Sequence, residues 1–165
     1  MDGAAICRAL DKMRKAGASL EELLTSAVTQ LHESHPKFDW TGIYELFPDN
    51  VLHLGPFVGA PTDHVFIGIG QGVCGTAVAE RRNINVPDVT AVSNYLACST
   101  STKSELVVLI RKAERIYAQI DIDSHERDAF DADAVKMVEK VADWLADAYA
   151  RNEKPSPSPM ARAGA

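Results

Sequence analysis

Cysteine is scarce in this sequence, and its few copies form no recognisable framework. Among 165 residues there are three, Cys7, Cys74 and Cys98, an odd number without a C-x-x-C pair. This excludes a disulfide scaffold and a zinc ribbon. The five histidines show no H-E-x-x-H or other paired ligand spacing, so bound zinc or iron is not expected. Any thiol chemistry should therefore be nucleophilic or redox.

The sequence also lacks an excess of basic residues and a long apolar run. Its 17 Lys and Arg against 23 Asp and Glu give a net charge of -6, so nucleic acid and anionic membranes are poor partners. A small cationic or zwitterionic ligand remains open. No stretch approaches about 18 consecutive apolar residues, and the N-terminus mixes charged with apolar residues, unlike a signal peptide. We therefore expect a cytoplasmic protein.

The composition is that of an ordinary folded domain. Hydrophobic residues make up 46% and charged residues 24%, and this length suits one domain with a substantial core. We expect the folded domain to span 1–150, with N-terminal helices in 1–35, the sheet and active-site loops in 38–125, and a C-terminal helix over 128–150. The remaining 151–165, rich in Pro, Ser and Ala, is predicted to be a disordered tail.

Apolar spacing predicts helices near both ends and strands between them. Apolar residues recur at helical intervals over 4–15 and 19–33, with Ser19 as a helix N-cap. Alternating apolar and β-branched runs predict two hairpins and two short strands, in the segments 38–59, 64–70, 83–86 and 105–123. The polar stretch 87–102 should be an irregular loop. This order indicates an α+β fold with a central, mainly antiparallel sheet flanked by N-terminal and C-terminal helices.

Three carboxylates are expected to meet on one face of the second hairpin. A turn centred on residue 113 or 114 makes Glu105 face Asp121 or Asp123, and these two aspartates, two residues apart, share a face. Like charges this close raise at least one pKa, which yields a candidate proton donor, while the remaining charges suit an ammonium ligand. The alternative is a solvated strand edge that ends in a polar turn.

Two thiols lie where chemistry is conceivable. Cys98 belongs to the hydroxyl-rich loop and can reach the carboxylates, unless it is an exposed bystander. Cys74 lies in GVCG, where a short helix begins; this position stabilises a thiolate, or the residue simply packs against the turn. The turn matches G-x-G-x-x-G, but the helix after it is too short and no acid-ended parallel strand follows, so we reject a dinucleotide site. Cys7 is expected to fill space on a helix.

Two aromatic residues share one face of the first hairpin. Trp40 and Tyr44 stand at positions i and i+4 of the same predicted strand. They are either core residues or the aromatic wall of a pocket.

Several motifs occur in one order, namely WTGIYEL, LGPFVGAP, GVCGTAVAERR, YLACS, SELVV and IDIDS. With them the sequence resembles a stand-alone GAF domain, and it is most similar to the free methionine-(R)-sulfoxide reductase family. The resemblance covers about 38–149. The 24-residue step from Cys74 to Cys98, and the steps to Glu105, Asp121 and Asp123, fit that family without a gap.

The resemblance implies an oxidoreductase that reduces free L-methionine-(R)-sulfoxide and needs no metal or organic cofactor. Cys98 would attack the sulfoxide sulfur and become a sulfenic acid, while Asp123 protonates the oxygen. The substrate-binding residues would be Trp40, Tyr44, Glu105, Asp121 and Asp123. A second thiol would then form a disulfide, which a thioredoxin-like protein reduces. Assembly as a homodimer stays open.

One position departs from the family pattern. Many relatives have a resolving cysteine ten residues before the GVCG cysteine, where this sequence has His64. Cys74 could resolve the sulfenic acid instead, or an external thiol could do so. The substitution also keeps open a different function, a GAF module that binds or senses a small ligand without catalysis. A dimerisation domain without a ligand would leave the three carboxylates unexplained.

Overall fold

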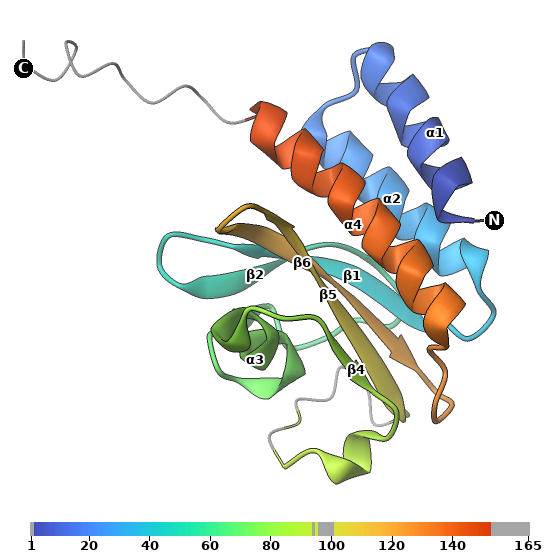
Figure 1. Cartoon of the computed structure of the whole chain (residues 1–165). Coiled ribbons are helices and arrows are strands. Elements are labelled where there is room, and N and C mark those ends of the chain that lie inside the picture. The colour runs from blue at the N-terminus through green and yellow to red at the C-terminus, as the bar shows by residue number, and fades with distance from the viewer. Residues whose placement is uncertain (1, 94, 96–100, 153–165) are drawn as a thin grey trace, which may run out of the picture.

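The computed structural model describes residues 2–93, 95 and 101–152 (Figure 1). It contains the helices α1 (Gly3–Lys15), α2 (Leu20–Ser34), α3 (Gly72–Glu80) and α4 (Ala132–Asn152), and the strands β1 (Trp40–Leu46), β2 (Val51–Val58), β3 (Phe66–Gly68), β4 (Ile84–Val86), β5 (Ser104–Lys112) and β6 (Arg115–Ser124). The predicted α+β class and both hairpins are confirmed. Within the described ranges, no helix is long and apolar enough to cross a membrane.

The six strands form one antiparallel sheet in the order β3-β2-β1-β6-β5-β4. The two long hairpins, β1–β2 and β5–β6, join where β1 pairs with β6. Strand β6 therefore lies inside the sheet, with a neighbour on each side. This junction places Trp40 opposite Asp123 and Gly42 opposite Asp121, so that residues from both hairpins share one face.

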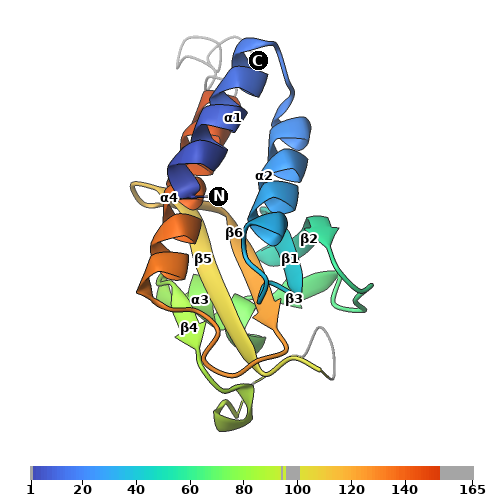
Figure 2. The same cartoon turned by 90° about the vertical axis from the view of Figure 1, so that its right-hand side faces the viewer.

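The two faces of the sheet carry different layers. Helices α1, α2 and α4 pack together on one face and form the larger core with Ile120 and Ile122 of β6 (Figures 1 and 2). In the described part of the chain, the opposite face carries the short α3 and a smaller core, which includes Tyr44 and Cys74. Because side chains alternate along a strand, the isoleucines of β6 anchor the helical layer while its acids point to the α3 side.

The helix N-termini follow the capping chemistry of the sequence. The predicted N-cap Ser19 accepts a hydrogen bond from the backbone N–H of Glu22, whose side chain accepts one from the Ser19 N–H in return. The predicted start of the C-terminal helix at Asp128 is wrong, since α4 begins at Ala132. Asp128 has a positive φ of 50°, and Asp131 caps the helix instead, accepting a bond of 2.8 Å from Ala134 N–H.

The polar stretch 87–102 is irregular in its described part, apart from one 3-10 turn. That turn spans Val89–Ala91, and Asp88 caps it through a hydrogen bond from the Thr90 N–H. The final part of the predicted tail, residues 153–165, lies outside the described residues.

Candidate functional site

The candidate site lies on the sheet face that α3 covers, where β1, β6 and β5 run side by side. Three cross-strand rows cross these strands: Trp40, Asp123 and Glu105; Gly42, Asp121 and Val107; and Tyr44, Gln119 and Leu109. The first row confirms the register predicted from the turn. Glu105 faces Asp123, and Asp121 lies one step further along the same face.

All three carboxylates are buried. Glu105 and Asp123 each expose 2% of their surface and Asp121 exposes none. The alternative of a solvated strand edge is wrong, because β6 is an interior strand and α3 lies over this face. Burying an ionised carboxylate is costly unless it is compensated, so this convergence calls for a chemical explanation.

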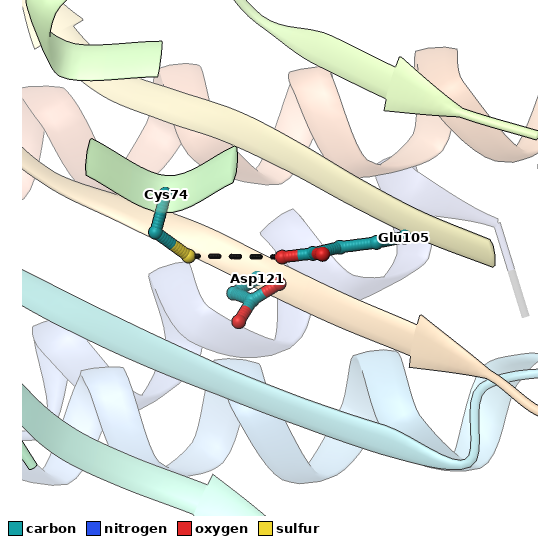
Figure 3. Close-up of side chains that lie close together, drawn as sticks. All are labelled: Cys74, Glu105 and Asp121. Carbon is teal, nitrogen blue, oxygen red and sulfur yellow. Dashed lines mark hydrogen bonds between the residues drawn. The ribbon is translucent and has the colours of Figure 1, made fainter. Parts of the chain in front are cut away.

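Cys74 brings a thiol to the carboxylates from the opposite side. It is the third residue of α3 and 4% exposed, and its Sγ lies 3.8 Å from Glu105 Oε1, to which it donates a hydrogen bond (Figure 3). Three possible metal-ligand atoms lie within 4.8 Å of one another: the Cys74 Sγ and one carboxylate oxygen each of Glu105 and Asp121. The helix approaches this closely because Gly75 has no side chain: a Cβ there would lie 2.3 Å from the Gly68 carbonyl oxygen.

The electrostatics of the cluster favour a protonated acid. The pKa of Glu105 is raised well above 4.5, chiefly by burial, and next by the negative charges of Asp121 and Asp123. The hydrogen bond from Cys74 opposes this rise only in part. Glu105 therefore retains a proton at pH values where an exposed glutamate has lost it, and the site holds a potential proton donor.

The two predicted aromatic residues lie beside the acids on the same face. Trp40 and Tyr44 are buried, with ring centroids 6.3 Å apart. Trp40 donates its indole N–H to the Ala60 carbonyl oxygen at 3.0 Å, and Tyr44 donates its hydroxyl to the His64 carbonyl oxygen at 2.8 Å. Both belong to the smaller core. Their packing confirms the core interpretation, whereas their contact with a substrate stays a prediction.

A small cavity adjoins the thiol and two of the acids. The cavity is large enough for about one water molecule. Its lining residues are His64, Ile67, Gln71, Gly72, Val73, Cys74, Glu105 and Asp121. His64, at the position where the resemblance led us to expect a resolving cysteine, thus borders the same cavity as Cys74. Gln71 and Ile67 were not singled out from the sequence, because single residues in a turn and in a three-residue strand carry no recognisable pattern.

Gln119 is a further polar residue on this face that the sequence did not single out. It is fully buried between Tyr44 and Leu109, and neither its Nε2 nor its Oε1 atom has a hydrogen-bond partner within the described structure. In the sequence, Gln119 interrupts an apolar run between Ala118 and Ile120. This interruption was the feature from which a buried polar residue could have been suspected.

The other two cysteines are placed differently. Cys98, the predicted nucleophile, lies outside the described residues. Cys7 is half-buried on α1, where its thiol lies 3.7 Å from the Lys140 carbonyl oxygen of α4, and burial raises its pKa. Cys7 packs with the helical layer, as the expected space-filling role requires.

These features define a class of protein: an α+β domain whose antiparallel sheet carries buried carboxylates and a thiol beneath a short helix. The chain belongs to the GAF domain family, whose model matches residues 19–149. The resemblance inferred from the sequence motifs is thereby confirmed.

Proteins similar to this chain include free methionine-R-sulfoxide reductases, which are oxidoreductases. The enzyme of that name from Escherichia coli is 39% identical over 100 residues, which are 61% of this chain and 58% of that protein. The type II free methionine-R-sulfoxide reductase from Thermoplasma acidophilum matches with a TM-score of 0.73 and 40% identity, over 78% of this chain and 94% of that one. The free methionine-R-sulfoxide reductase from Neisseria meningitidis, solved in complex with its substrate, matches with a TM-score of 0.81 and 26% identity. The match covers 90% of this chain and 88% of that one.

Proposed function

We propose that this chain reduces free L-methionine-(R)-sulfoxide to methionine. The observation that carries the proposal is the convergence of Glu105, Asp121 and Asp123 in a buried position beside Cys74, within a family that includes reductases of this substrate. A free amino acid carries an ammonium group, which buried carboxylates bind well. A sulfoxide oxygen needs a proton before it can leave sulfur, and a protonated carboxyl of the buried cluster can supply one.

The proposed chemistry transfers one oxygen atom. The Cys98 thiolate attacks the sulfoxide sulfur while Asp123, which faces Glu105 in the same row, delivers a proton to the oxygen. The substrate sulfur gains two electrons and leaves as methionine; the Cys98 sulfur loses two electrons and takes the oxygen as a sulfenic acid. Glu105, ionised once the positive ammonium charge lies beside it, and Asp121 bind the ammonium group. Trp40 with Tyr44 forms the apolar side of the S-methyl site.

The substrate requires more room than the described cavity offers. An amino acid is much larger than the single water molecule that fits there, so binding requires the surrounding residues to separate. Cys74 and His64 both border the cavity, and separation would expose the Cys74 thiol. Substrate entry and exposure of a second thiol are therefore coupled in this proposal.

Turnover requires a second thiol to remove the sulfenic oxygen. A thiol that condenses with the Cys98 sulfenic acid forms a disulfide and releases water, and a thioredoxin-like dithiol then reduces the disulfide. With His64 in place of the usual cysteine, we assign the resolving role to Cys74, or to an external thiol where Cys74 cannot reach. A small thiol such as dithiothreitol bypasses this requirement.

The test is the consumption of free L-methionine-(R)-sulfoxide with dithiothreitol as reductant. We expect wild type to consume this epimer and to leave the S epimer and a peptide-bound sulfoxide intact. The Cys98→Ser variant should be inactive, whereas the matched Cys7→Ser variant, which changes a thiol on the helical side, should keep full activity. Activity of Cys98→Ser equal to wild type would refute the mechanism. Binding of the sulfoxide without turnover by wild type would favour the ligand-sensing GAF module.

A further inference from the structure

Cys74, Glu105 and Asp121 form a ligand set of the kind that holds a transition metal. Each comes from a different element, α3, β5 and β6, and in Figure 3 the thiol and the Glu105 carboxylate point toward each other above Asp121. The Sγ to Oε1 distance is 3.8 Å, and one ligand atom from each residue lies within 4.8 Å of the others. A tetrahedral zinc ion with ordinary Zn–S and Zn–O bonds holds its sulfur and oxygen ligands about 3.6 Å apart. The three side chains therefore need only small movements to share one ion.

An independent observation points to a ligand at the same place. Glu105 is 98% buried, since 2% of its surface is exposed, and its second carboxylate oxygen, Oε2, has no hydrogen-bond partner within the described structure. Buried carboxylate oxygens are normally satisfied. The adjoining cavity, lined by all three side chains, has room for about one water molecule, which is the space that a fourth, solvent ligand of a metal ion needs.

We propose that Cys74, Glu105 and Asp121 bind a divalent cation of the zinc class, with a water molecule as the fourth ligand. The Cys74 thiol and the protonated Glu105 carboxyl release their protons to solvent, and both bind the cation in their ionised forms. A sulfur ligand selects borderline ions such as Zn²⁺ and Co²⁺. It disfavours Mg²⁺ and Ca²⁺, which require six or more oxygen ligands. This ligand set could not be recognised from the sequence. The set contains no histidine, and its cysteine lies 31 residues before Glu105, so it matches no metal-binding motif.

The cation site overlaps the proposed substrate site. Glu105 and Asp121 are the groups to which the substrate ammonium was assigned, so the cation and the sulfoxide exclude each other. Bound Zn²⁺ also occupies the thiol assigned to resolve the sulfenic acid. This consequence, inhibition of reduction by Zn²⁺, rests on the proposed function, whereas the binding of the ion does not.

The test uses Co²⁺ as a coloured probe, because a cobalt ion bound by a thiolate has a charge-transfer absorption band. The protein is the full chain with Cys7→Ser and Cys98→Ser, which leaves Cys74 as its single thiol. We expect one equivalent of Co²⁺ to produce the band, Zn²⁺ to remove it, and excess Mg²⁺ to leave it unchanged. Glu105→Gln in the same background, a change that preserves the side-chain shape, should weaken Co²⁺ binding about tenfold or more.

Matched controls separate loss of the site from loss of the fold. Glu114→Gln, at an exposed position of the β5–β6 turn, should leave Co²⁺ affinity unchanged, and circular dichroism should show that every variant is folded. Absence of the band in the folded single-thiol protein would overturn the proposal, as would a Glu105→Gln variant with undiminished affinity. Because the titration contains neither sulfoxide nor reductant, its result does not depend on whether the chain is a reductase.

Discussion

Replacing Gln119 with methionine should stabilise the protein, which is unusual for a change at a fully buried position. Both amide atoms of Gln119 lack a hydrogen-bond partner in the described structure, and the residue is flanked by Tyr44 and Leu109. An unsatisfied buried polar group costs about 1–3 kcal/mol. Methionine has nearly the same length and shape, and an exchange of this kind costs less than about 1.5 kcal/mol in packing. We therefore expect a net gain of about 1 kcal/mol.

Urea unfolding at equilibrium measures this gain as a higher midpoint at constant slope. A domain of this size gains about 2–4 °C in melting temperature per kcal/mol. Gln71→Met is the matched control with the opposite sign, because Gln71 is exposed and accepts a hydrogen bond from the Gly68 N–H at 2.8 Å; its loss should cost about 1 kcal/mol. If Gln119→Met lowers the free energy of unfolding by 1 kcal/mol or more, the amide is satisfied by ordered water and the reasoning fails.

Three further predictions concern the acids and the second thiol. In metal-free protein, burial raises the pKa of Glu105 above the 4.5 of an exposed glutamate, so the folded state holds a proton that the unfolded chain releases. Stability should fall as the pH rises from 4.5 through the folded pKa; Glu105→Gln should remove this slope, and an unchanged slope in urea titrations would contradict it. Asp123→Asn should slow sulfoxide reduction about a hundredfold, and an unchanged pH–rate profile would assign the proton to another group. Cys74→Ser should impair turnover with thioredoxin more than turnover with dithiothreitol; equal loss with both reductants would exclude a resolving role.

The face of the acids and their approximate register could be predicted from the sequence, because both depend largely on local features. A turn centred on residue 113 or 114 predicted Asp121 or Asp123 opposite Glu105, and the structure pairs Glu105 with Asp123. The alternation of apolar and acidic residues along β6 likewise fixed the face on which the aspartates lie. Short-range geometry was sufficient for the face, whereas the final partner of Glu105 also depends on a register shift in the ladder between Ile110 and Arg111.

Burial of the site could not be predicted in this way, because it depends on contacts between distant segments. The pairing of β1 with β6 puts the acids in the interior of the sheet, and α3 then brings Cys74 to within 3.8 Å of Glu105. Neither the order of strands nor the position of a nine-residue helix follows from residue spacing. The start of α4 was missed for a local reason, since Asp128 and Asp131 are both good N-caps and the structure uses the second.

A single-turnover experiment tests the proposed chemistry most directly. Fully reduced protein is mixed with free L-methionine-(R)-sulfoxide in the absence of any reductant and in the presence of dimedone, which traps sulfenic acids. The proposed mechanism predicts one methionine released per chain and, on Cys98, either the dimedone adduct or a disulfide with Cys74. No methionine, or an adduct on Cys7 or Cys74 in place of Cys98, would contradict it.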